Sequence, residues 1–143
     1  MGVDAQIQTE DGRPIERLDD PRACVAMFLG LTNAEATACL RFIDPYGLTL
    51  FNPYQLPVLE AEIKARVSTI DPSVLRVHRK HRLDEAIRVG WQATVIETLR
   101  KDVEAASEAE DVQEVKAHMN QVLALIGRAR SGGDHTYLRF MGD

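Results

Sequence analysis

The stretch RFIDPYGLTLFNPYQLPVLEAEI, residues 41–63, carries turn, strand and helix signals in one run. Its tetrapeptide DPYG at 44–47 has the composition of a type I β-turn, with Asp first, Pro second and Gly fourth. Residues 36–44 place apolar side chains on both faces of an alternating pattern, which predicts a central strand, and LTLF at 48–51 predicts its return. The stretch is therefore interpreted first as a turn between two strands.

A helix is predicted directly after this pair of strands. Asn52 and Pro53 are typical of an N-cap and a first helical position, and the helix is expected to run to about Val67. Pro57 removes a backbone hydrogen bond if it lies beyond the first turn. We therefore expect the regular helix to begin near Leu56.

The segment before this stretch predicts a hairpin and a helix. Residues 3–9 alternate apolar and polar side chains, as in a half-buried strand. The Asp-Gly pair at 11–12 is a strong signal for a hairpin turn, with a short return strand at 15–18. Residues 19–31 then predict a helix of two to three turns, which begins at Asp20-Pro21 and ends at Gly30.

The segment after it predicts a connection, two helices and a final strand, at residues 68–82, 83–103, 112–130 and 135–143. In the first of these helices, apolar residues recur every four positions from Leu83 to Leu99, and Trp91 keeps this step. Trp91 is therefore predicted to lie in the core. The acidic residues at 104–111 predict a solvated break between the two helices.

This order of elements predicts the α+β class. We expect one domain, residues 1–143, with an antiparallel or mixed sheet of about five strands and helices packed mainly on one face. The segments LRFID at 40–44 and LRFMGD at 138–143 repeat each other, which suggests neighbouring strands. The C-terminal strand is then structural, and its removal is expected to destabilise the fold.

Composition narrows the class of protein. The chain has 143 residues, of which 45% are hydrophobic and 27% charged, as in globular proteins. No apolar run approaches the roughly 20 residues that cross a bilayer, and the start has no basic and apolar regions of a signal peptide, so a cytoplasmic protein is expected. Cys24 and Cys39 have small or apolar neighbours, which predicts buried free thiols.

One candidate ligand site lies near the DPYG turn. Loops held at the rim of a sheet commonly present binding groups. If the two LRF segments are neighbours, one rim could carry Asp44, Tyr46, His135 and Asp143. The alternative is that the turn only reverses the chain, and we weight this structural interpretation above the functional one.

A second candidate site is the basic run RVHRKHR at 76–82. Phosphate groups could bind its four cationic side chains, Arg76, Arg79, Lys80 and Arg82. The net charge of −5 and the absence of an aromatic residue in the run argue against nucleic acid. Acidic residues at 101–114 could instead pair with the run.

His78 and His81 are three residues apart and could meet on one helical face as two metal ligands. A catalytic metal site normally has a third protein ligand, and the neighbouring cationic side chains oppose a divalent ion. We therefore predict no metal site and no cofactor.

The segments CLRFIDPYGLTLFN and HTYLRFMGD resemble a group of small bacterial proteins with this strand-turn-strand and a Tyr-Leu-x-Phe-x-Gly-Asp ending. An acidic residue often follows the turn glycine in that group, whereas Leu48 stands here. The resemblance implies a bacterial, cytoplasmic origin and brings no activity, cofactor or ligand.

The leading functional hypothesis is a small protein-binding or self-associating domain, with another protein or a second copy as partner. No nucleophile motif such as GxSxG or CxxC is present, so an enzyme is the minority interpretation. The alternatives are a small-molecule-binding or hydrolytic site near Asp44, and phosphate or nucleic-acid binding at 76–82.

Overall fold

The computed structural model describes residues 2–105 and 107–143, and it divides the chain into two compact units. Unit 1 comprises Met1–Thr69 and Glu114–Asp143, and unit 2 comprises Ile70–Gln113. Unit 1 holds a sheet with helices and unit 2 is helical, so the predicted α+β class is confirmed. That the whole chain is one domain stays a prediction.

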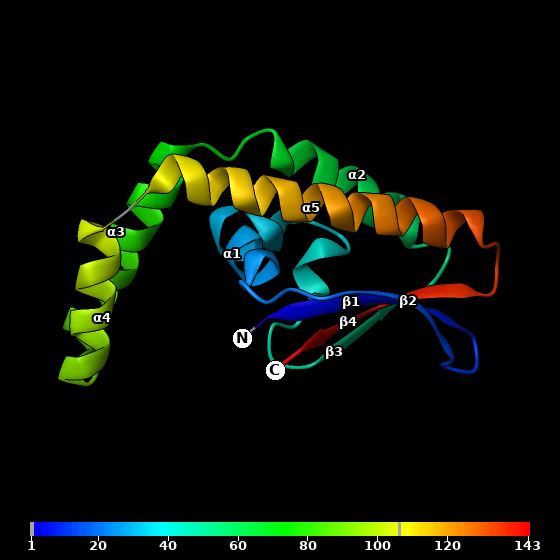
Figure 1. The fold of residues 1–143 in the computed structure, drawn as a ribbon, viewed down its shortest axis with the longest axis horizontal. Coiled ribbons are helices and arrows are strands. Elements are labelled where there is room, and N and C mark those ends of the chain that lie inside the picture. Colours follow the sequence, from blue (N-terminus) through cyan, green and yellow to red (C-terminus); the bar gives the residue numbers. More distant parts are fainter. Residues whose placement is uncertain (1, 106) are drawn as a thin grey trace. The chain divides into compact units, whose positions relative to one another are not determined.

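Within the described part of the chain, the sheet of unit 1 has four strands, fewer than the five or so expected. They are β1 (Val3–Thr9), β2 (Pro14–Leu18), β3 (Leu48–Phe51) and β4 (Thr136–Gly142), in the spatial order β2-β1-β4-β3. Every neighbouring pair is antiparallel. The C-terminal strand β4 pairs along its whole length with β1 and also with β3, so it is an interior strand (Figure 1).

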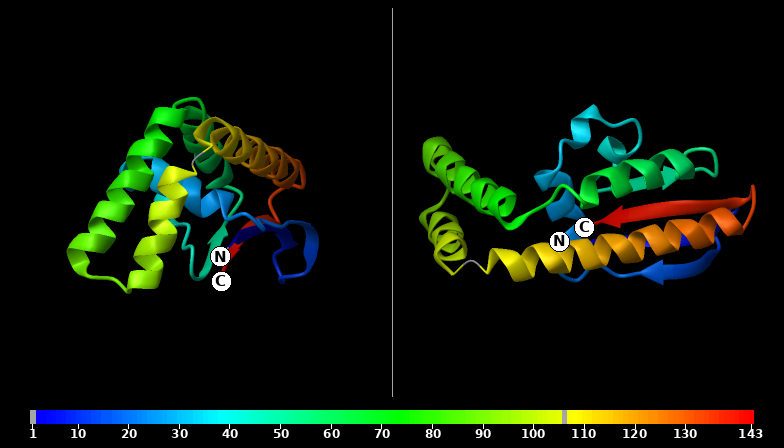
Figure 2. Two further views of the ribbon diagram at one scale, coloured as in Figure 1. Left: turned by 60° about the vertical axis from the view of Figure 1, so that its left-hand side comes forward. Right: turned by 90° about the horizontal axis from the view of Figure 1, so that it is seen from above.

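One face of the sheet forms the core of unit 1. Alternate side chains of β1 and β4 are buried, and Phe51 of β3 packs edge-on against Phe140 with ring centroids 5.8 Å apart. Three helices contribute buried side chains: α1 (Cys24–Leu31), α2 (Leu56–Val67) and α5 (Glu108–Ser131). Figures 1 and 2 show α1, α2 and the C-terminal part of α5 on the same side of this sheet.

The segment 36–44 is not the central strand that the sequence predicts. It forms short 3-10 turns, η1 (Ala34–Ala36) and η2 (Leu40–Phe42). The carboxylate of Glu62 in α2 accepts hydrogen bonds from the backbone N–H groups of Ala38, Cys39 and Leu40 at 2.6, 2.8 and 3.3 Å. Because a side chain from α2 satisfies these donors, the segment needs no neighbouring strand.

The DPYG turn is observed where it was predicted. The Asp44 carboxylate accepts a hydrogen bond from the backbone N–H of Tyr46 at 2.9 Å, as in an Asx turn. The backbone N–H of Gly142 donates to the carbonyl of Gly47 at 2.8 Å. A β-carbon at Gly142 would overlap the carbonyl oxygen of Pro45, so this glycine allows the turn to contact β4.

Unit 2 corrects the predicted boundaries of two helices. The expected connection at 68–82 lies largely within α3 (Pro72–Val89), because Asp71 caps its N-terminus by accepting the N–H of Val74 at 3.1 Å. The predicted continuous helix 83–103 is broken between α3 and α4 (Ala93–Glu104). Gly90 has a φ of 80°, and the N–H of Trp91 donates to the carbonyl of Ala86, which is a Schellman ending.

Trp91 is not a core residue, which is a second correction in unit 2. Its side chain lies in the link between α3 and α4 and is 44% exposed. Because the helix breaks at Gly90, Trp91 no longer lies on the same helical face as the apolar residues of α4, of which Leu99 is buried. Among the described residues, no helix combines the length and apolar character needed to cross a membrane.

Candidate functional site

The structure places three of the four residues predicted near the DPYG turn at one end of β4 and the fourth, His135, at the other end. Asp44 and Tyr46 lie in the turn that contacts Gly142, and Asp143 follows Gly142. His135 precedes the other end of β4, about 20 Å away along a strand of this length. Its ring is 83% exposed, and its Nδ1 lies 2.9 Å from a carboxylate oxygen of Glu10.

The basic run at 76–82 lies on α3, and acidic side chains at the start of α5 partly neutralise it. Arg76 pairs with Glu108 at 3.0 Å and Arg79 pairs with Asp111. Lys80 and Arg82 are exposed. The phosphate site stays a prediction, and two of its four cations have carboxylate partners within unit 2.

His78 and His81 both lie on α3. Partial burial lowers the pKa of His78, with smaller contributions from the Arg82, His81 and Arg79 side chains. A lowered pKa favours the neutral ring, but neither histidine belongs to the one group of three potential metal ligands that the described residues contain.

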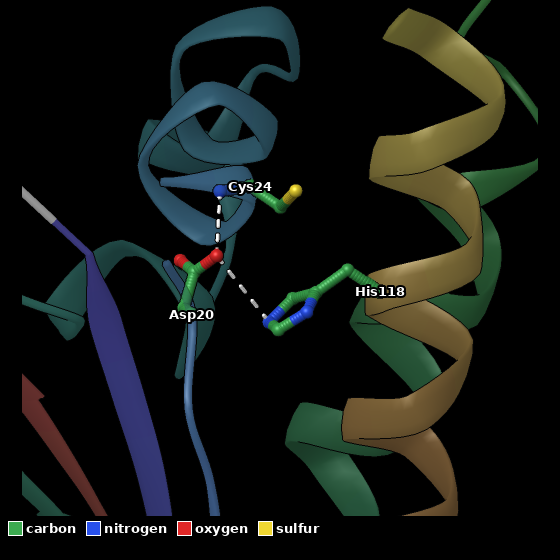
Figure 3. Close-up of side chains that lie close together, drawn as sticks. All are labelled: Asp20, Cys24 and His118. Atoms are coloured by element: carbon green, nitrogen blue, oxygen red, sulfur yellow. Dashed lines mark hydrogen bonds and ion pairs between the residues drawn. The ribbon is translucent and has the colours of Figure 1, made fainter. Parts of the chain in front are cut away.

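That group consists of Asp20, Cys24 and His118 in unit 1 (Figure 3), of which Asp20 and Cys24 are buried and His118 is partly buried. Asp20 lies just before α1, Cys24 is the first residue of α1, and His118 projects from α5. One potential ligand atom from each side chain lies within 4.8 Å of the other two. We call this group the Asp20 cluster.

Backbone hydrogen bonds fix the Asp20 carboxylate. One oxygen accepts the N–H of Cys24 at 2.8 Å, and the other accepts those of Val25 and Val3 at 3.0 and 3.2 Å. Ala23, just before α1, has a φ of 54°, so the backbone turns sharply between Asp20 and the first residue of the helix. Asp20 thus joins the start of β1 to the start of α1.

The surroundings of the thiol are apolar and acidic. Burial raises the pKa of Cys24 to about 11, and the carboxylates of Asp20 and Glu114 add to the effect. The ring Nε2 of His118 lies 3.6 Å from an Asp20 oxygen, which is longer than a hydrogen bond. A cavity of about 370 Å³ adjoins the cluster, and Glu114 and Gln121 also line it.

Sequence reasoning missed the Asp20 cluster. It treated Asp20 as a helix start and Cys24 as a buried thiol, and it did not single out His118. One signal was available, because Glu114 and His118 are four residues apart in a predicted helix and so share a face. Nothing in the sequence places that face against Asp20.

A second feature of unit 1 is the free edge of β3. Four large apolar side chains on and before this strand are exposed: Tyr46 (69%), Leu48 (63%), Phe42 (57%) and Leu50 (51%). Leu48 and Leu50 lie opposite Met141 and Arg139, on the sheet face away from the core. We call the exposed side chains of Leu48 and Leu50, together with the edge of β3, the β3 surface.

The two edges of the sheet differ in how they are protected. At the other edge, β2 carries Pro14, Glu16 and Arg17, and its register shifts opposite Ile7 and Gln8. Proline, charge and bulges are devices that prevent edge pairing. The strand β3 (Leu48–Phe51) contains no charge and no proline. Its short length is therefore the only one of these protections against edge pairing that it has.

No family model, curated protein or solved structure matches this chain.

Both thiols are expected to resist alkylation in the folded protein. Cys24 and Cys39 are 4% and 6% exposed, and burial raises the pKa of each. For Cys24, a rise from 9.0 to about 11 lowers the reactive thiolate population at neutral pH about 100-fold. Mass spectrometry after iodoacetamide treatment at pH 7 should find unmodified protein, and urea-unfolded protein should carry two labels. Rapid labelling of Cys24 in the folded protein would contradict the buried site.

Proposed function

We propose that this protein is a binding module that pairs with a second copy of itself through the β3 surface. The observation that carries the proposal is the uncharged open edge of β3, which has exposed leucines beside it. Among the described residues, β3 has a strand partner on one side only, β4. Helices gathered mainly on the other face of the sheet would leave the leucine face free for a partner.

The backbone of β3 has hydrogen-bonding groups available at this edge. Gly142 donates to Gly47, and hydrogen-bonded and non-hydrogen-bonded pairs alternate along an antiparallel ladder. Leu48 and Leu50 are therefore in the non-hydrogen-bonded pairs with β4. Their N–H and C=O groups point away from β4, toward the open edge.

A second copy fits this edge because the pattern is self-complementary. Antiparallel pairing around a twofold axis at Thr49 places Leu48 opposite Leu50 of the second copy. Each leucine pair then forms main-chain hydrogen bonds across the edge and buries apolar area on one face. A partner strand with charged side chains at these positions would bury those charges beside leucine side chains, which is unfavourable.

The net charge of −5 predicts how salt acts on this association. Two like-charged copies repel each other, and salt screens this repulsion. Because the strand β3 itself carries no charge, we expect the dimer to persist or strengthen at high salt. An interface built on ion pairs would weaken instead.

The test is light scattering after size-exclusion chromatography at low and high salt, over a range of concentrations. We expect a dimer for the native chain and a monomer for Leu48→Lys/Leu50→Lys, because lysines at the edge oppose strand pairing. The matched control is Ile15→Lys, which changes an exposed apolar residue on the protected β2 edge and should stay dimeric.

Two results would overturn the proposal. One is a native chain that stays monomeric at every concentration and salt. The other is a dimer that survives the double lysine substitution while circular dichroism shows an intact fold.

A further inference from the structure

We propose that the Asp20 cluster is a binding site for a divalent transition-metal ion of the zinc type, with Asp20, Cys24 and His118 as its protein ligands. The three side chains offer an oxygen, a sulfur and a nitrogen donor, which are the donor types that zinc uses in proteins. This site is independent of the β3 surface.

The spacing of the donor atoms suits one shared ion. In a tetrahedral zinc site with ordinary bond lengths, neighbouring ligand atoms are about 3.3–3.6 Å apart. The oxygen of Asp20 and Nε2 of His118 are 3.6 Å apart, and all three donors lie within 4.8 Å of one another.

The ligands are also held in place by the fold. The Asp20 carboxylate is fixed by three backbone donors, and the Cys24 backbone is one of them. The His118 side chain is 10% exposed, and the Asp20 side chain is fully buried. Side chains that are already ordered lose little conformational entropy when they bind the ion, which favours high affinity.

The charges of the site balance those of a dication. Binding replaces the thiol proton of Cys24, which leaves to solvent, and forms a thiolate-metal bond. The thiolate and the Asp20 carboxylate together carry two negative charges, so a buried M²⁺ ion is neutralised. Arg22 lies near the site, and its charge is already paired with Glu114 at 2.8 Å.

The adjoining cavity leaves a position for a fourth ligand. Catalytic zinc sites use three protein ligands and keep a fourth position for water or substrate. The cavity of about 370 Å³ borders all three ligands and provides room for such a molecule. Glu114, one helical turn before His118, also lines it.

Cobalt spectroscopy of the chelator-treated full chain tests the proposal. Co²⁺ titration should give intense d–d bands of tetrahedral cobalt and a thiolate-to-cobalt charge-transfer band, saturating at one ion per chain. Zn²⁺ should abolish both signals by displacement. Zinc should also raise the melting temperature, because it binds the folded state.

Substitutions assign the ligands. Cys24→Ala should remove the charge-transfer band, and His118→Gln should lower the zinc association constant by more than about 100-fold, since losing even an outer-shell partner costs 10–100-fold. The matched controls are Cys39→Ala, the other buried thiol, and His81→Gln, an exposed histidine on α3. Both controls should bind as the native chain does.

Three results would overturn the proposal. The first is a native chain that gives no charge-transfer band at saturating cobalt. The second is a band that persists in Cys24→Ala. The third is unchanged zinc affinity in His118→Gln, with circular dichroism showing the fold intact. If His81→Gln instead loses the cobalt signal, the ion is bound on α3.

Discussion

Asp20→Ala is expected to lower the free energy of unfolding by about 3–5 kcal/mol, because it leaves three buried backbone donors without an acceptor. These donors are the N–H groups of Val3, Cys24 and Val25. The substitution affects both the first strand and the start of α1. Urea unfolding followed by far-UV circular dichroism, with a chelator present to exclude any metal effect, should show the midpoint fall.

The neighbouring aspartate provides the control. The side chain of Asp19 is 72% exposed and pairs with Arg17 at the surface, so Asp19→Ala should cost under about 1 kcal/mol. Trp91 is the chain's one tryptophan and lies in unit 2, so its fluorescence follows that unit separately. Equal losses for the two substitutions would contradict the role assigned to Asp20.

Phe140→Ala is expected to destabilise unit 1 by about 3–5 kcal/mol, the usual cost of removing a large buried aromatic side chain. Phe140 is fully buried on an interior strand and packs against Phe51. Its loss leaves a cavity that the paired backbones of β1 and β4 cannot close. The same urea experiment measures the effect.

Met141→Ala is the matched control for Phe140. Met141 is the next residue on β4, half-buried on the opposite face of the sheet. We expect its replacement to cost under about 1 kcal/mol. If Met141→Ala proves as costly as Phe140→Ala, the assignment of Phe140, and not Met141, to the core face of the sheet is wrong.

Local signals in the sequence were sufficient for several elements. The alternation in residues 3–9 and the Asp-Gly turn predicted β1 and its hairpin, and the structure has both. The DPYG turn, the start of α2 near Leu56 and the C-terminal strand were also predicted correctly. In each of these the signal and the structure it specifies lie within a few residues of each other.

Other signals were present but were weighed wrongly. Asp71-Pro72 is the same kind of N-cap signal as Asn52-Pro53, and the predicted connection at 68–82 does not make use of it. Gly90 is a helix-ending residue, but the apolar stripe on either side of it predicted one continuous helix. Periodicity alone cannot detect a helix end, because the stripe can resume in the next helix with the same step.

The sequence by itself thus determined the α+β class, the hairpin, the DPYG turn and the start of α2 near Leu56, because these depend on local backbone preferences and apolar period. The tertiary structure alone decided that Glu62 holds residues 38–40 where the 3-10 turn η2 begins, and that His118 lies beside Asp20 and Cys24. It also decided that the uncharged strand β3 lies at an edge. The physical reason is that each of these depends on a contact between segments distant in the chain, and neither partner carries a local signal of the other.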